Sequence, residues 1–288
     1  MLIPKSLKQE LEDITKSKIA TFSSCAVDCV NQVGVITLEN KQKVFLKWND
    51  RASCDFFSAE SHGLKLLGEV NGVTVPNILH VGESYPFIVL EYLPADDIPG
   101  SQSLLGQTIN ALHSVTSLAP GLEIDNYLGL LPQQNRVSKQ HRRIDWVDFF
   151  VEYRLKPQAV LGEQNSWFTW DFAQLFNQKH SNIIEILKSG EQEFSLLHGD
   201  LWSGNVHWSS GKPYLIDPAV YYGSREADIA FMSLFGSLDP EFFEAYDMPL
   251  ADGFEVRKHV LNLYHLMNHA NIFGGQYVET VWSILEAL

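Results

Sequence analysis

Three polar side chains near two predicted turns are the residues best suited to chemistry. Asp200 and Asn205 lie five positions apart in the run HGDLWSGN (198–205), and Asp217 follows the apolar run Tyr214–Ile216. A carboxylate and an amide oxygen can hold Mg²⁺, while a second carboxylate can orient a hydroxyl group for attack. Transfer of a phosphoryl group needs such groups, because its transition state spreads negative charge over several oxygens.

The spacing matches the catalytic segments of kinases. Their catalytic loop reads H-R-D-x-x-x-x-N, and a metal-binding D-F-G aspartate follows farther along the chain. On this pattern Asp200 accepts the proton of the acceptor hydroxyl, and Asn205 and Asp217 hold the metal. Taken singly, each of the three is better explained as a turn former, since HGD and SGN both favour loops. Their joint spacing favours the catalytic interpretation.

A predicted strand and helix near the N-terminus supply two further candidates. Lys47 ends a third strand that begins around Val44, where kinases place the lysine that contacts the α- and β-phosphates of ATP. A lysine at a strand end is usually just solvated. Here Glu60 lies in the amphipathic run 56–67, at the position of the helix glutamate that pairs with that lysine. We therefore expect Lys47 and Glu60 to form an ion pair.

Several segments resemble the fructosamine (ketosamine) kinase family, within the larger aminoglycoside and choline kinase-like group. The resemblance is carried by HGDLWSGN (198–205), IDPAVYYGSREADIAF (216–231) and LFGSLDPEFFEAY (234–246), with 125–134, 145–158 and 264–277, and it covers nearly the whole chain. It implies an α+β, protein-kinase-like fold of two lobes. An N-terminal lobe with an antiparallel sheet and one helix would span 1–93, and a larger, mainly helical C-terminal lobe would span 94–288.

The resemblance also implies an activity. Members of this family use ATP to phosphorylate an alcohol group, the third hydroxyl of sugars joined to amines by glycation, after which the product decomposes and releases the amine. The expected cofactors are ATP and Mg²⁺. The acceptor would be a free or protein-bound ribulosamine, erythrulosamine or fructosamine, so the activity would be a deglycation repair.

Other site residues are assigned by position. The loop between the first two strands of the 19–46 region would cover the nucleotide with Ser24 and Cys25, where family members tend to have paired glycines. The hinge residues Glu91, Tyr92 and Leu93 would offer backbone groups to adenine. The same residues would also be found at the ordinary end of a strand.

In the second half of the chain, five residues are expected to serve the site directly or to support it. Trp202, inside the catalytic loop, would contact the sugar or brace the loop, and Arg225 and Glu226 would touch the acceptor or each other. His198 and Asp228 are predicted to be structural, with Asp228 accepting hydrogen bonds from the loop backbone.

Helices are predicted from apolar periodicity. The expected helical segments are 6–18, 56–67, 104–115, 145–155, 167–175, 183–187, 229–235, 257–271 and 277–288, while 119–143 reads as a loop. His265 and His269 have a zinc-like spacing of four, but without an acidic or cysteine partner they are more typical of a packed helix face. His113 is likewise assigned to packing.

Composition limits the class of protein. The net charge of −14 argues against nucleic acid or an anionic membrane surface as a partner, because phosphate groups require clustered lysine and arginine. Three cysteines in 288 residues are not typical of a disulfide framework, and from the sequence we expect neither a signal peptide nor a membrane-spanning segment. We expect a cytoplasmic protein.

Two other functions are compatible with these residues. One is a kinase of the same fold that acts on an aminoglycoside, choline or homoserine. The other is a nucleotide-binding pseudokinase or scaffold, which the glycine-poor covering loop would permit. The presence of Lys47, Asp200, Asn205 and Asp217 argues against the loss of turnover.

Cys25 generates a prediction about oxidation. A thiol in a loop beside Lys47 and a bound metal would gain thiolate character, and two protomers could join through it, giving a redox-linked homodimer. The alternative, which is more typical of a single cysteine, is a buried, inert thiol in a monomer. Mild peroxide should therefore produce a slower-migrating, less active dimer on non-reducing gels, reversed by thiols and absent in Cys25→Ser. A wild-type protein whose migration and activity do not change would contradict this.

Overall fold

An antiparallel sheet of five strands forms the first part of the molecule. The computed structural model describes residues 3–25, 30–83, 85–96, 100–137, 144–236 and 238–288. Within them the sheet has the order β1-β2-β3-β5-β4. The strands are β1 (Ile19–Ser24), β2 (Gln32–Leu38), β3 (Lys43–Trp48), β4 (Ile78–Val81) and β5 (Phe87–Glu91).

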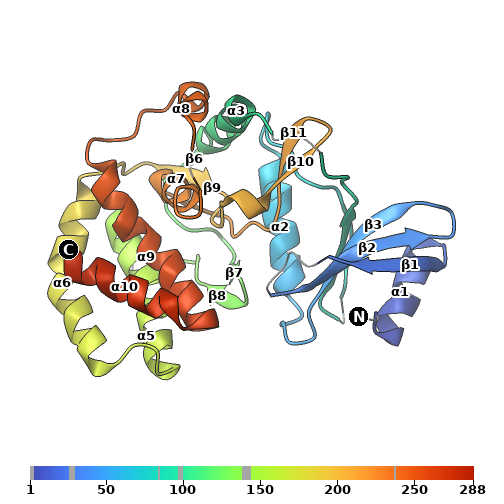
Figure 1. The fold of residues 1–288 in the computed structure, drawn as a ribbon, viewed down its shortest axis with the longest axis horizontal. Coiled ribbons are helices and arrows are strands. Elements are labelled where there is room, and N and C mark those ends of the chain that lie inside the picture. Colours follow the sequence, from blue (N-terminus) through green and yellow to red (C-terminus); the bar gives the residue numbers. More distant parts are fainter. Residues whose placement is uncertain (1–2, 26–29, 84, 97–99, 138–143, 237) are drawn as a thin grey trace.

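Alternation along these strands determines which helix covers each face. Val44, Leu46 and Trp48 of β3 point to one face, where they pack with Leu7 and Leu11 of α1 (Lys5–Thr15). On the opposite face, α2 (Phe56–Gly68) packs against Ile88 and Leu90 of β5. The Lys47 side chain points to the same face of the sheet as α2. Figure 1 shows α1 on the outer side of the sheet and α2 between the sheet and the rest of the chain.

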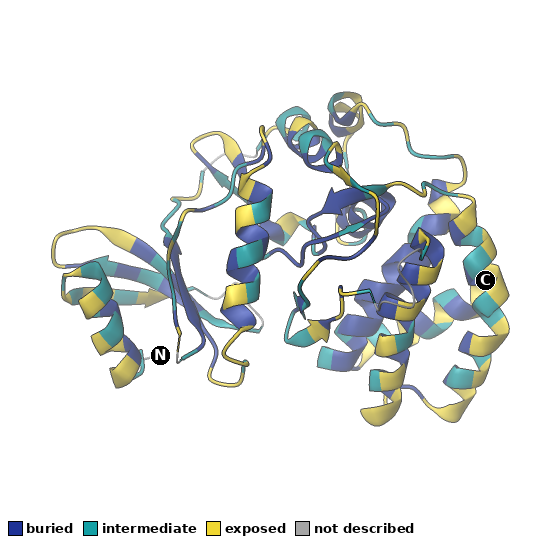
Figure 2. Cartoon of the chain, turned by 180° about the vertical axis from the view of Figure 1, so that it is seen from behind, coloured by how far each residue is buried: buried dark blue, intermediate teal, exposed yellow. Residues whose placement is uncertain are grey.

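Helices dominate the second part of the molecule and surround one large apolar core. Buried residues line the sides of these helices that face one another (Figure 2). The helices are α3 (Gln102–His113), α4 (Trp146–Phe150), α5 (Lys156–Gln164), α6 (Trp170–Lys188), α7 (Glu226–Met232), α8 (Pro240–Tyr246), α9 (Phe254–Phe273) and α10 (Gln276–Ala287).

Short strands in this helical part hold the loops that carry the candidate site. A three-stranded sheet has the order β12 (Tyr221–Gly223), β9 (Phe194–Leu197), β6 (Thr116–Ser117). A hairpin of β10 (Val206–Ser209) and β11 (Lys212–Leu215) follows the catalytic loop. Ser210 and Gly211 form its turn with positive φ angles of 53° and 72°, as a tight two-residue hairpin turn requires.

The fold class predicted from the sequence is confirmed, with an antiparallel sheet lobe followed by a mostly helical part. The predicted loop over 119–143 is wrong in part, because it contains the hairpin β7 (Asn126–Leu128) and β8 (Leu131–Gln133). Strands of three residues, one of which includes Pro132, are too short to show alternation. The boundary at residues 93 and 94 stays a prediction.

A π-helical turn, η2 (Val151–Leu155), interrupts the helix predicted over 145–155. Pro157 lies in the first turn of α5 and has no N–H to donate, so the preceding turn cannot continue with regular α-helical hydrogen bonds. The wider turn keeps α4 and α5 connected. No helix in the described part of the chain is long and apolar enough to cross a membrane.

Candidate active site

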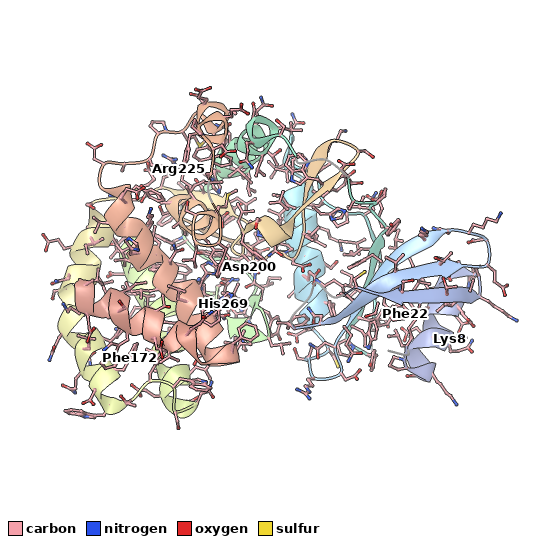
Figure 3. The ribbon with its side chains drawn as sticks, in the orientation of Figure 1. Lys8, Phe22, Phe172, Asp200, Arg225 and His269 are labelled. Carbon is pink, nitrogen blue, oxygen red and sulfur yellow. The ribbon has the colours of Figure 1, made fainter. Side chains whose placement is uncertain are left out.

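The catalytic loop joins β9 to β10 and is closed by hydrogen bonds between its own residues. Asn205 Nδ2 donates to the backbone carbonyl oxygen of Asp200 at 2.7 Å and to its Oδ2 at 3.0 Å. Ser203–Asn205 forms a single 3₁₀ turn. These bonds hold the Asp200 carboxylate in place through one of its oxygens, Oδ2. It lies where the two parts of the molecule face each other (Figure 3).

Asp228 holds the start of this loop in place through its buried carboxylate. Its carboxylate accepts hydrogen bonds from the backbone N–H groups of His198 at 2.8 Å and Gly199 at 3.0 Å, and it contacts His113 Nε2 at 3.2 Å. Burial would raise the pKa of Asp228, but the contact with His113 and the loop N–H groups outweigh it and hold this pKa below its usual value. The carboxylate therefore stays charged at the base of the loop.

Two neighbours of Asp200 are adapted to the sharp turn. Gly199 has a φ of +80°, and a Cβ atom there would lie 2.0 Å from the carbonyl oxygen of Ala219. His198 is fully buried, so burial lowers its pKa and keeps the ring neutral. Its Nε2 donates to the carbonyl oxygen of Ile216 at 2.9 Å, which leaves Nδ1 to accept from the Asp200 N–H at 3.3 Å.

Asp217 and Asn205 come together because they flank the same hairpin. Val206 pairs with Leu215, and the N–H of Ile216 donates to the carbonyl oxygen of Asn205 at 3.1 Å. Asp217 has a φ of +56°, in the left-handed region that residues other than glycine rarely occupy. Such backbone strain tends to occur at functional sites, where it directs a side chain.

Lys47 links this hairpin to the N-terminal sheet. Its Nζ donates to Glu60 Oε1 of α2 at 2.9 Å and also contacts Asp217 Oδ1. Lys47 and Glu60 are both buried, whereas Asp217 keeps a third of its side chain exposed. The structure thus brings Lys47 and Glu60 together, and it places them beside Asp217.

The site carries an excess of negative charge. Burial and then the charge of Asp217 raise the pKa of Asp200 to about 7. A divalent cation between Asp217 and Asn205 would reduce this repulsion, and carboxylate and amide oxygens are ligands that Mg²⁺ accepts. Among the described residues there is no cluster of three His, Cys, Asp or Glu that could hold a metal by itself. An ion held by Asp217 and Asn205 would therefore complete its coordination with oxygens from water or from a bound ligand.

The hinge residues are occupied by protein contacts. The Glu91 side chain accepts from Asn77 Nδ2 at 2.7 Å, and the carbonyl oxygen of Leu93 accepts from His207 Nε2 at 3.0 Å. The ring of Tyr92 lies 5.2 Å from Lys43 Nζ. An adenine-binding role for these three residues stays a prediction.

The covering loop begins as an extension of the first hairpin. Ser24 pairs with Gly34, and the N–H of Cys25 donates to the carbonyl oxygen of Val33 at 3.0 Å. Cys25 is half-buried. Positions 26–29, including Cys29, lie outside the described residues, so the predicted phosphate contact of this loop is not tested.

Arg225 and Glu226 are both held by contacts within the helical part of the molecule, and their predicted contact with the acceptor stays a prediction. Glu226 is buried and forms a bidentate ion pair with Arg257 of α9, in which both hydrogen bonds measure 2.7 Å. Arg225 donates to the carbonyl oxygen of Pro249 at 2.7 Å. Figure 3 shows Arg225 well away from Asp200, on the side of α3 and α8.

Trp202 lies over its own loop. A Cβ atom on Gly204 would come within 2.3 Å of the Trp202 ring, and the ring centroid is 6.1 Å from that of Phe235. The ring is half-buried, so it braces the loop and still presents surface to solvent. Both predicted roles of Trp202 are compatible with this position.

Sequence reasoning missed other residues around the site. Asn126 and Gln133, from β7 and β8, donate to the carbonyl oxygens of Val220 and Ala219, each at 2.9 Å, and so support the chain just after Asp217. His265 of α9 lies 3.9 Å from the Asp200 carboxylate. No local signal marks these contacts, because each connects segments far apart in the sequence.

Comparisons with known proteins agree on one family. The family model described as fructosamine kinase matches residues 3–288. A probable ketoamine kinase of Vibrio parahaemolyticus is 38% identical over 248 residues, covering 84% of this chain and 83% of the relative. A probable ketoamine kinase of Synechocystis is 32% identical over 291 residues, covering 98% and 95%.

Solved structures give the same result. A candidate fructosamine-3-kinase from Haemophilus somnus superposes with a TM-score of 0.83 at 28% identity, covering 97% of this chain and 95% of the other. An aminoglycoside phosphotransferase, APH(2")-IIa, solved with streptomycin and ATP, has a TM-score of 0.65 at 15% identity and covers 100% and 97%. The second likeness concerns the fold alone.

The buried pair of Glu226 and Arg257 yields a prediction that separates a structural role from an acceptor contact. Glu226→Gln should lower the free energy of unfolding in urea by about 3 kcal/mol, because it leaves a buried guanidinium without its counter-charge. The KM for the acceptor, measured where the variant is folded, should stay within twofold of wild type. Glu241→Gln, at an exposed position of α8, is the control and should change neither quantity. A raised acceptor KM with unchanged stability would contradict the structural role.

Proposed function

Because this chain belongs to the fructosamine kinase family and is an ATP-dependent phosphotransferase, we propose that it phosphorylates a sugar hydroxyl of a ketosamine, at O3. The observation that carries the proposal is the convergence of Asp200, Asn205, Asp217 and Lys47 at the junction of sheet and helices. That set of groups suits the transfer of a phosphoryl group to a hydroxyl.

Asp200 is proposed to orient the acceptor hydroxyl and take its proton. The acceptor oxygen forms a bond to the γ-phosphorus of ATP, the bond from that phosphorus to the β,γ-bridging oxygen breaks, and ADP leaves with the electron pair. The proton of the hydroxyl passes to Asp200 Oδ1, because Oδ2 accepts the hydrogen bond from Asn205. The loop anchor at Asp228 supports this role by holding the backbone beneath the carboxylate.

Asn205 and Asp217 are proposed to hold Mg²⁺. Bound there, Mg²⁺ would neutralise charge on the transferring phosphoryl group. Asn205 Nδ2 is directed at Asp200, so its amide oxygen is directed away from that residue and is available as a ligand. Lys47, held by Glu60, is proposed to contact the phosphates of the nucleotide. The hinge at Glu91–Leu93 and the loop at Ser24 and Cys25 are proposed to contact the rest of ATP.

A substrate panel tests the proposed function. Release of ADP in the presence of Mg²⁺ should be stimulated by ribulose-lysine or fructose-lysine and much less by choline or kanamycin. Stimulation by choline or kanamycin alone would favour the related small-molecule kinases. Nucleotide binding without turnover on any of the four would favour a pseudokinase.

Replacing the proposed base should uncouple transfer from nucleotide binding. In Asp200→Asn, kcat for the best ketosamine should fall by at least about 100-fold, because the amide cannot accept the proton in the same way. The affinity for Mg-ATP should change less than threefold, since Asp200 is not a proposed metal ligand. Binding and turnover measured on the same preparation check this, and an equal loss in both would refute the assignment.

Replacing the proposed metal ligand should act on binding first. Asp217→Ala should weaken Mg-ATP at least about tenfold while affecting metal-free ATP less, because the cation loses its charged ligand. Calorimetric titrations with and without Mg²⁺ measure the difference. Asp171→Ala, at an exposed position at the start of α6, serves as a control for the lost charge. Undiminished Mg-ATP affinity in Asp217→Ala would move the metal site elsewhere.

A further inference from the structure

His265 presents an unused ring nitrogen next to the proposed base. The residue is 4% exposed, and its Nδ1 has no hydrogen-bond partner among the described residues. That nitrogen lies 3.9 Å from Asp200 Oδ1, which is too far for a direct hydrogen bond. A buried polar nitrogen left without a partner destabilises the folded protein, so its presence here requires a reason.

Packing alone does not supply that reason. The ring is stacked on Phe231, with centroids 3.6 Å apart and an angle of 10° between the planes. An apolar side chain would fill this place without leaving a polar nitrogen unsatisfied. The neighbouring His269 is hydrogen-bonded through its Nδ1 to the backbone carbonyl oxygen of His265 and not to the His265 ring. The stacking fixes the plane of the ring and keeps Nδ1 directed toward Asp200.

The free nitrogen and the free carboxylate oxygen form a pair. Asn205 binds Oδ2 of Asp200, and Oδ1 is the oxygen nearer to His265. Two polar atoms separated by 3.9 Å can each bind one of two oxygens carried by adjacent carbon atoms of the same ligand. Sugars offer such neighbouring oxygens, whereas an isolated alcohol does not.

We propose that His265 Nδ1 binds the oxygen on a carbon next to the phosphorylated hydroxyl, so that His265 determines specificity for acceptors with adjacent oxygens. The inference rests on the proposed function, because it takes the acceptor hydroxyl to lie at Asp200 Oδ1. Burial, and to a lesser extent His269, lowers the pKa of His265 to about 3. The ring is neutral, so Nδ1 can donate to a carbonyl oxygen or accept from a hydroxyl group.

Three variants test this role. His265→Leu removes the nitrogen, His265→Asn keeps a polar atom close to the position of Nδ1, and His265→Gln moves it toward the position of Nε2. Each is assayed with the best ketosamine and with two analogues, one lacking the oxygen on each carbon beside the phosphorylated position. Mg-ATP affinity and thermal stability are measured in parallel to detect general damage.

The expected result is a loss that depends on the missing oxygen. His265→Leu should lower kcat/KM for the complete ketosamine about tenfold, mainly through KM, as expected for one lost hydrogen bond. With one of the two analogues, wild type and His265→Leu should be equal within twofold. His265→Asn should recover most of the activity and His265→Gln should not, and this comparison still decides the matter if His265→Leu fails to fold.

Two results would overturn the proposal, and they differ from failure of the proposed function. Equal loss in His265→Leu with the complete ketosamine and with both analogues would make His265 a packing residue. Equal activities of His265→Asn and His265→Gln would do the same. If wild type phosphorylates no ketosamine, the proposed function fails first and this inference with it.

Discussion

Asp228 is buried and charged, and the geometry of the catalytic loop depends on how that charge is satisfied. The carboxylate accepts two backbone N–H groups from the loop and contacts His113, which in turn contacts the hydroxyl group of Tyr246 at 2.8 Å. A buried carboxylate is tolerated only when its oxygens are fully hydrogen-bonded. The hydrogen bonds that compensate the burial of the Asp228 carboxylate therefore also fix the turn at Gly199 and the direction of Asp200. Helices α3, α7 and α8 meet at this group, so the helical core determines the shape of the loop.

A second constraint arises from the alternation of side chains along β3. Because the side chains of a strand alternate, Lys47 faces α2 while Val44, Leu46 and Trp48 face α1. Glu60 meets Lys47 there, and Asp217 reaches the same ammonium group from the β10–β11 hairpin. The Lys47 ammonium group thus joins the sheet, helix α2 and the hairpin, and a one-residue slip of β3 would abolish both of its ion pairs.

Local spacing and long-range contacts differ in how well they can be predicted from the sequence. The association of Asp200, Asn205 and Asp217 could be predicted because they flank one loop and one hairpin, and the pairing of Lys47 with Glu60 because two neighbouring elements carry them. The partners of Arg225 and Glu226 could not be predicted, since Arg257 lies on a distant helix. The same holds for the approach of His265 to Asp200, whereas the packing of the His265 ring, here on Phe231, agrees with the sequence prediction. The hairpin in 126–133 and the π-helical turn depend on short-range details that apolar periodicity does not record.

The hydrogen bond between His207 and the carbonyl oxygen of Leu93 has a mechanical consequence. His207 belongs to β10, and Asp96 accepts hydrogen bonds from the N–H groups of Ser210 and Gly211 in the turn of the same hairpin, both at 2.8 Å. The chain is thus fastened to the hairpin at Leu93 and Asp96, while Glu91 is still paired within the sheet. Tyr92 is therefore the single residue between the attachment to the sheet and the attachment to the hairpin. A change in the angle between the sheet and the hairpin would require new backbone angles at Tyr92, and it would also strain the contact of Lys47 with Asp217.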